Sequence, residues 1–288
     1  MKINQLDVRW DEPHFGKIIR EKWKIANGIL NKNAPLIVFG CYSSLLKSNL
    51  MNQTGLVVIV WSGGDSLRLH ERTDFVQYCK DNEHRIFHFA HSWWIQHDLE
   101  HWGLKYIDKV ILPQNLEQFQ FDPHPGKSIY HYTTSDGGRE WFYGTDIVKP
   151  LRDRWVNVKR LPDNVYITNL GGYRGQGLLD VYRDSSVGVR LTEHDNMALS
   201  CIEMGLMGRR SIFNGNIPCA IPYPSKEYYY NAELKKNPLF RVDNLESTIG
   251  SLILAHWNDE PDKLLAEEMR EFVYDDEKWL NTEYYENL

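Results

Sequence analysis

Residues 182–212, YRDSSVGVRLTEHDNMALSCIEMGLMGRRSI, decide the fold of this chain. A short β-forming run at 187–191 is followed by a polar, turn-like segment at 192–196. Apolar side chains then recur at roughly helical spacing through residues 197–207, and Gly208 follows where a helix C-cap is expected. The pattern predicts a strand, a polar loop and a helix, with a further strand at 210–214.

Two acidic residues stand out in this predicted unit. Asp195 and Asn196 come at the start of the helix, where unpaired amide groups and the positive end of the dipole favour a phosphate or a sugar hydroxyl. Glu203 lies two turns further along, on a side of the helix that is otherwise apolar. From the residues alone, the two acids are either a helix cap and a solvated side chain, or contacts to a polar ligand.

The stretch resembles the donor-binding signature of retaining glycosyltransferases of the GT-B fold, the group 1 (glycosyltransferase family 4-like) family. That signature has a Tyr, a strand, an acidic residue, seven residues, and a Glu in a helix that ends near a Gly. Tyr182, Asp195, Glu203 and Gly208 match it, with Asp in place of the usual first Glu and Asn196 in place of the common Gly. The resemblance implies an α/β protein with two Rossmann-like domains facing a cleft.

The same resemblance implies an activity and a set of contacts. It implies a hexosyltransferase-like enzyme that takes a nucleotide-sugar donor, retains the anomeric configuration, and needs neither a metal nor another cofactor. Asp195 is an expected catalytic residue that would hold the donor sugar and diphosphate, and Glu203 would bind the ribose hydroxyls of the nucleotide. Tyr182 belongs to the expected donor site, as do the backbone amides of three residues at the helix start, Asn196, Met197 and Ala198.

Basic residues are expected near the donor diphosphate, because the family places them after the first strand of the second domain. Arg139 follows a predicted strand at 128–134, and Lys149 lies further along the chain. Arg174 is in the loop GGYRGQG at 171–177, after a predicted strand at 164–170, and is expected either to cover a bound nucleotide or to lie in a loop whose glycines only turn the chain. Bidentate pairing of Arg with phosphate supplies the physical reason, although a solvated Arg on a loop is also consistent with these positions.

Length and composition bound the class of protein. The chain has 288 residues, enough for two domains, and its 42% hydrophobic and 25% charged residues are typical of globular proteins. A formal charge of −6 argues against a broadly basic surface for nucleic acid or an anionic membrane. Four scattered cysteines favour free thiols in the cytoplasm, and neither a signal peptide nor a membrane span is expected.

The first half of the chain alternates between strands and helices. Apolar runs of the buried-strand type occur at 35–40, 55–61, 85–90 and 106–113, and helical spacing occurs at 11–31 and 91–102. Alternation of this kind predicts a parallel sheet covered on both faces, with ligands beyond the carboxyl ends of its strands. By the resemblance this domain would hold the acceptor, and Asp65 and His91, which follow two of the strands, are expected catalytic residues at the cleft.

The segment HDLEH at 97–101 allows a different function. It matches H-x-x-E-H, in which His97 and His101 share a helix face as zinc ligands and Glu100 acts as general base. The motif has only three fixed positions, and no pattern further along the sequence identifies the third ligand that a catalytic zinc requires. A zinc-dependent hydrolase is therefore an alternative, and the other reading of the segment is a surface helix whose Trp side chains pack inward.

Proline, glycine and polar residues at 114–127 predict the boundary between two domains. We expect an acceptor domain at 1–122, a donor domain at 123–274 containing helices at 244–256 and 261–274, and a C-terminal helix at 275–288. In the family such a helix crosses back to the first domain. The sequence leaves the acceptor open among a glycan, a small molecule and a modified nucleic acid. It also leaves open the oligomeric state and a non-catalytic sugar- or nucleotide-binding module.

Overall fold

The computed structural model describes residues 7–10, 33–41, 44–112, 114–133, 141–157, 166–168, 175–192, 194–196, 198–223, 243–275 and 277–287. The chain divides into two compact units. Unit 1 comprises Met1–Asn115, His194–Met197 and Val273–Leu288, and unit 2 comprises Leu116–Glu193 and Ala198–Phe272. In the described part of the chain, no helix has the length and apolar character needed to cross a membrane.

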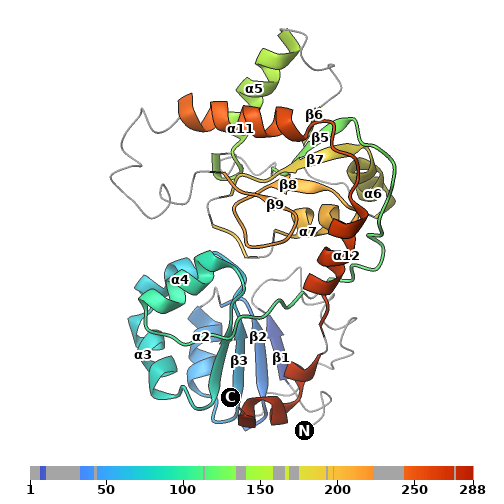
Figure 1. Ribbon diagram of the computed structural model, residues 1–288. Helices are drawn as coiled ribbons and strands as arrows, with labels where there is room; N and C mark the ends of the chain where they lie inside the picture. Colours follow the sequence, from blue (N-terminus) through green and yellow to red (C-terminus); the bar gives the residue numbers. More distant parts are fainter. Residues whose placement is uncertain are drawn as a thin grey trace. The chain divides into compact units, whose positions relative to one another are not determined.

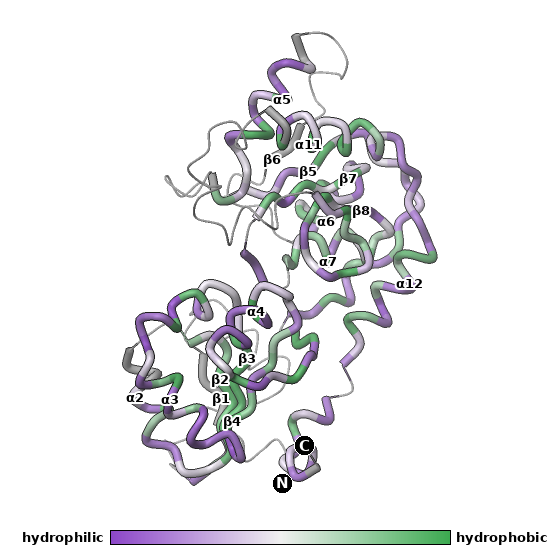
Figure 2. The backbone as a smooth tube through the Cα atoms, turned by 60° about the vertical axis from the view of Figure 1, so that its left-hand side comes forward, coloured by the Kyte–Doolittle hydropathy of each residue, from purple (hydrophilic) through white to green (hydrophobic). Residues whose placement is uncertain are grey.

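Unit 1 is built on a parallel four-stranded sheet. Its strands are β1 (Asp7–Trp10), β2 (Leu36–Phe39), β3 (Val57–Val60) and β4 (Ile86–Phe89), in the spatial order β1-β2-β3-β4. Strands β2 and β3 consist entirely of apolar residues, all of them buried. They form hydrophobic stretches of the tube in Figure 2, as expected for parallel strands that are covered on both faces.

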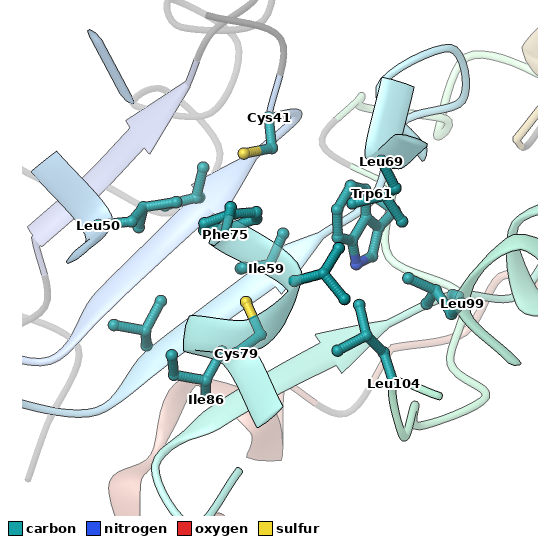
Figure 3. Packing of buried hydrophobic residues seen from close by; sticks show 14 of the residues in the cluster. Cys41, Leu50, Ile59, Trp61, Leu69, Phe75, Cys79, Ile86, Leu99 and Leu104 are labelled. Carbon is teal, nitrogen blue, oxygen red and sulfur yellow. The ribbon is translucent and has the colours of Figure 1, made fainter. Parts of the chain in front are cut away.

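One face of this sheet is covered by the helices α2 (Ser44–Met51), α3 (Thr73–Asp81) and α4 (Trp93–His101). Alternate strand residues such as Val38 and Ile59 pack there against Leu50, Phe75 and Leu99 from the three helices. Figure 1 shows these helices on one side of the sheet, and Figure 3 shows Ile59 among the labelled side chains of this cluster. A 3-10 helix, η2 (Ser66–Glu71), connects β3 to α3. The expected helix at 91–102 is confirmed as α4, whereas the expected helix at 11–31 lies outside the described residues.

The opposite face is covered by the C-terminal segment. Residues 273–288 belong to unit 1 and contain two 3-10 helices, η4 (Lys278–Leu280) and η5 (Thr282–Asn287), rather than one continuous α-helix. Trp279 is fully buried and makes edge contacts with the rings of Phe39 and Phe89. Tyr285 packs on the same face and donates a hydrogen bond of 2.6 Å to the backbone carbonyl of Trp279.

The strand expected at 106–113 is wrong. A single parallel bridge joins Ile107 to Phe89, and the chain then leaves the sheet. The next two residues are charged and use their side chains elsewhere: Asp108 pairs with His91, and Lys109 pairs with Asp275. The apolar residues of this segment are buried although they form no strand. Ile111, for example, is covered by the C-terminal segment and not by a neighbouring strand.

Unit 2 is built on a parallel five-stranded sheet. Its strands are β5 (Ser128–His131), β6 (Tyr166–Thr168), β7 (Ser185–Val189), β8 (Arg210–Ile212) and β9 (Ala220–Ile221), in the order β6-β5-β7-β8-β9. The strand order reverses between β5 and β7. In open parallel sheets such a reversal is the topological switch point, and ligands bind outside the carboxyl ends of the strands that flank it.

Helices cover both faces of the unit 2 sheet. One core face packs against α5 (Thr145–Asn157), which follows η3 (Trp141–Tyr143), and against α11 (Asp243–His256). Figure 1 shows α7 (Leu199–Leu206) on the other side of the sheet, where it packs with α12 (Lys263–Phe272). Helix α6 (Gln176–Arg183) precedes β7. The helices expected at 197–207, 244–256 and 261–274 are confirmed within a few residues as α7, α11 and α12.

Candidate functional site

The carboxyl ends of β2 and β3 in unit 1 are tied together by Asp65. Its carboxylate accepts backbone N–H groups from Cys41 at 2.9 Å and Gly63 at 2.9 Å, and from Ser62 and Ser66 at 3.2 Å. Asp65 is fully buried, and burial raises the pKa of its carboxyl against the effect of these hydrogen bonds. These hydrogen bonds show that the buried carboxylate holds the backbone of the two loops in place. The catalytic role expected for Asp65 stays a prediction.

His91 follows β4 at the same edge of the sheet. Its Nδ1 lies 2.6 Å from Oδ1 of Asp108, and its side chain is largely buried whereas that of Asp108 is exposed. An imidazole paired with a carboxylate in this way has the chemistry of a general base that is held in one orientation. The catalytic role expected for His91 likewise stays a prediction.

Three consecutive residues, His194, Asp195 and Asn196, belong to unit 1, although strand β7 and helix α7 on either side of them belong to unit 2. We call them the 194–196 segment. The backbone carbonyl of Asp195 accepts a hydrogen bond of 2.6 Å from Ser92, and Oδ1 of Asp195 accepts one of 2.9 Å from the amide of Asn196. The side-chain amide of Asn196 donates to the carbonyl of Trp61 at 2.8 Å.

Of the two expected donor residues that follow Asn196, the structure describes one. Met197 lies outside the described residues. Ala198 is buried at the N-cap of α7 with φ 38°, a left-handed backbone that residues with a side chain rarely adopt. Its carbonyl accepts the amide of Cys201 at 2.7 Å, so this conformation starts the helix. Gly208 follows α7 with φ 83°, as expected for a C-cap.

Tyr182 and Glu203, two positions of the signature, are in direct contact. The hydroxyl of Tyr182 donates a hydrogen bond of 2.7 Å to Oε2 of Glu203. Tyr182 is buried, whereas Glu203 keeps part of its surface exposed. Burial raises the pKa of Glu203 to about 7, opposed by the hydrogen bond from Tyr182 and the positive charge of Arg190. Glu203 is therefore a partly exposed carboxylate that retains acceptor capacity for another hydroxyl.

Arg190, which the sequence analysis did not single out, lies at the switch point of the unit 2 sheet. It directly follows β7, and its guanidinium carbon is 4.0 Å from the ring centroid of Tyr132, which directly follows β5. Tyr143 lies on η3 with its ring 5.8 Å from the same carbon, and Nη1 is 3.3 Å from Oγ of Ser200 in the first turn of α7. The guanidinium stands where the topology favours a ligand, with a charge that favours an anion.

The structure describes only one of the three basic residues expected at the donor site. Arg139 and Arg174 lie outside the described residues. Lys149 is on α5 and is exposed. In the sequence Arg190 is a charged residue near the end of the β-forming run at 187–191, but its position at the switch point depends on β5 lying beside β7, which the sequence does not show.

The HDLEH segment forms the last turns of α4, and its side chains differ in their exposure to solvent. His97, Glu100 and His101 are exposed, and Glu100 accepts a hydrogen bond of 2.8 Å from Tyr106. Among the residues described, no group of three or more His, Cys, Asp or Glu side chains is arranged to hold a metal ion. The buried polar contacts are made instead by Asp98, one of the two positions that the zinc motif leaves unspecified. Its Oδ2 lies 2.9 Å from Nε2 of His194 and accepts from Ser66 at 2.7 Å.

Comparison with known proteins bears on the fold. No protein-family model matches the chain, and no curated protein sequence does. Solved structures do match. TarM superposes with a TM-score of 0.51 and 13% identity over 95% of this chain and 57% of TarM. The pneumococcal O-GlcNAc transferase GtfA, in complex with UDP and GlcNAc, superposes with a TM-score of 0.52 and 10% identity over 88% of this chain and 56% of GtfA.

A third match is the sucrose-phosphate synthase of Thermosynechococcus elongatus, with a TM-score of 0.50 and 13% identity over 94% of this chain and 75% of the synthase. These neighbours are glycosyltransferases of the GT-B type, and their likeness assigns to this chain the fold of two Rossmann-like domains. The chain spans 57% and 56% of the lengths of TarM and GtfA. At these identities the likeness concerns the fold alone.

Proposed function

We propose that this protein is a glycosyltransferase that moves a sugar from a nucleotide-sugar donor to a hydroxyl acceptor with retention of configuration. The observation that carries the proposal is the placement of Arg190 against Tyr132 at the switch point of the unit 2 sheet, with Glu203 on the helix that follows. A cation and a carboxylate thus lie on one domain of the GT-B fold, as a nucleoside diphosphate requires.

Each group has a separate task in this proposal. The guanidinium of Arg190 binds the diphosphate, while the carboxylate of Glu203, oriented by Tyr182, accepts hydrogen bonds from the ribose hydroxyls. Asp195 and the amides at the start of α7 hold the sugar. In the full donor site Arg139, or in second place Lys149, would neutralise the diphosphate, and Arg174 would cover the nucleotide.

The reaction proposed here uses electrostatic stabilisation rather than a metal. The bond between the anomeric carbon and the diphosphate oxygen breaks, and its electron pair leaves with the diphosphate, which Arg190 and the helix dipole stabilise. The acceptor hydroxyl attacks the same face of the sugar and loses its proton. His91, paired with Asp108, is the proposed base, and Asp65 shapes the loops beside it. The proposed acceptor is a glycan or a small hydroxylated molecule.

A thermal-shift screen tests the proposal, followed by turnover. The ligands are UDP, GDP and ADP, and the donors are UDP-glucose, UDP-GlcNAc and GDP-mannose. We expect one nucleoside diphosphate to raise the melting temperature and the matching donor to release it when a sugar acceptor is present. Binding without release under any acceptor would favour the second candidate, a non-catalytic sugar- or nucleotide-binding module. Absence of binding to every nucleotide would overturn both.

A further inference from the structure

The 194–196 segment is held at each of its residues by a different part of unit 1. His194 contacts Asp98 in α4 at 2.9 Å, the carbonyl of Asp195 accepts from Ser92 at 2.6 Å, and Asn196 donates to the carbonyl of Trp61 at 2.8 Å. These partners come from a helix, its N-cap and the residue after β3. Three successive residues fixed in this way leave the backbone of the segment little freedom to rotate.

Ser92 uses its hydroxyl in an unexpected way. It occupies the N-cap position of α4, where a serine side chain ordinarily accepts a backbone N–H of the first turn, but it makes no such cap hydrogen bond. Its hydroxyl instead donates to Asp195, a residue 103 positions away in the sequence. Ser92 is fully buried, so this hydrogen bond is protected from competition with water.

Asp98 supports the neighbouring position. His194 is fully buried, and Asp98 keeps only 13% of its side-chain surface exposed. Oδ2 of Asp98 receives both the hydroxyl of Ser66 and the ring nitrogen of His194, and these two groups are 3.4 Å from each other. A buried carboxylate with two hydrogen-bonding partners fixes the imidazole, and with it the backbone that leads into Asp195.

We propose that Ser92 and Asp98 are positioning residues for sugar transfer, because they fix the backbone of the 194–196 segment, which carries Asp195. The inference rests on the proposed function and extends it to residues of unit 1 that do not themselves contact the donor. It also gives the HDLEH segment a role through Asp98 instead of through its histidines.

Hydrogen–deuterium exchange and steady-state kinetics test this together, on the full chain. The variants are Ser92→Ala, Ser92→Thr, which retains a hydroxyl, and Asp98→Ala. Ser251→Ala is the matched control, because it also removes a serine hydroxyl bonded to a backbone carbonyl, on an exposed face of α11. Circular dichroism and the melting temperature establish that each variant is folded.

We expect exchange in a peptide covering residues 190–200 to become about tenfold faster in Ser92→Ala and Asp98→Ala, with peptides from β2 and β8 unchanged. With the sugar nucleotide that the wild type turns over, kcat should fall by about 10–100-fold while KM for the donor changes little. Ser92→Thr should recover much of the loss, and Ser251→Ala should match the wild type.

Two results would overturn the positioning role. One is unchanged exchange at 190–200 in folded Ser92→Ala and Asp98→Ala proteins. The other is a kcat equal to that of the wild type in both variants. A wild-type protein that releases no nucleotide from any donor would instead refute the proposed function, and the two failures are therefore distinguishable.

Discussion

The hydroxyl of Tyr182 donates a hydrogen bond of 2.7 Å to the carboxylate of Glu203, joining helix α6 to helix α7. The contact fixes one carboxylate oxygen and leaves the other for a further donor. If that donor is a ribose hydroxyl, Glu203→Gln should weaken binding of the nucleoside diphosphate by about 1–3 kcal/mol, the range for losing a hydrogen bond to a charged group. Isothermal titration calorimetry measures the effect.

Glu100→Gln is a matched control for that experiment. Glu100 also accepts a hydrogen bond from a tyrosine, Tyr106 at 2.8 Å, but it is exposed and lies on α4 of unit 1. Its substitution should leave nucleotide binding unchanged. Equal losses in Glu203→Gln and Glu100→Gln, or no loss in either, would contradict the ribose-binding role.

The raised pKa of Glu203 predicts that nucleotide binding depends on pH. The ionised carboxylate accepts ribose hydroxyls best, so affinity should fall as the pH drops through about 7, where this group takes up a proton. The titration should be carried out between pH 6 and 8.5, roughly one unit or more on either side of that value. The corresponding step should be missing in Glu203→Gln. A pH profile that is identical in the two proteins would assign the titration to another group.

The same pKa has a consequence of opposite sign for stability. The pKa of Glu203 is raised from 4.5 to about 7 in the folded protein, so the folded state binds more protons than the unfolded state between these values. The contribution of Glu203 to the free energy of unfolding is therefore most favourable below about 4.5 and is lost as the pH rises through about 7. Denaturant unfolding at several pH values should show a flatter dependence in Glu203→Gln.

Arg190 should matter for the diphosphate more than for the nucleoside. Arg190→Gln is expected to lower affinity for the diphosphate by about tenfold or more and affinity for the nucleoside by much less, because a charged hydrogen bond to phosphate is lost. Arg152→Gln, which changes an exposed arginine on α5, is the control. A loss that is equal for nucleoside and diphosphate would point to a packing defect around Tyr132.

Metal chemistry separates the transferase from the zinc hydrolase. We expect purified protein to contain no stoichiometric zinc and EDTA to leave sugar transfer intact. His97 and His101 are exposed, and a catalytic zinc needs a third protein ligand besides these two. His97→Ala combined with His101→Ala should leave nucleotide binding unchanged. Zinc that co-purifies in stoichiometric amount, together with loss of all activity in the double variant, would replace the transferase with the hydrolase.

The charge of the chain bears on the acceptor. A formal net charge of −6 predicts that duplex DNA binds weakly and that a glycan or small molecule is the better acceptor. A gel shift at increasing salt is the appropriate measurement, because phosphate contacts give a steep salt dependence. Tight binding to duplex DNA that weakens sharply with salt would reverse this preference.

The sequence predicted the strands of unit 1 well wherever burial on both faces imposed an unbroken apolar run, as in β2 and β3. The same criterion failed at 106–113, since Ile111 is buried by the C-terminal segment and not by a neighbouring strand. An apolar residue in the sequence predicts that its side chain is buried, but it does not predict which helix, strand or loop buries it.

Contacts between distant parts of the chain could not be predicted from the sequence, for a related reason. The resemblance to the donor-binding signature indicated both Tyr182 and Glu203, although Tyr182 lies on α6, ahead of the strand–loop–helix unit. The position of Arg190 over Tyr132 depends on β5 and β7 being neighbours, and the contact of Asp98 with His194 joins residues 96 positions apart. Strand order and long-range hydrogen bonds have no periodic signature in a single sequence.

The carboxylate of Asp65 has a consequence for the dynamics of unit 1. Since it accepts the amides of Cys41, Ser62, Gly63 and Ser66, the loops after β2 and β3 share a single buried hydrogen-bonding partner. An opening that displaces the carboxylate breaks all four hydrogen bonds at once and leaves these amides without their acceptor. Their amide protons should therefore exchange together, in one cooperative opening event with a common free energy.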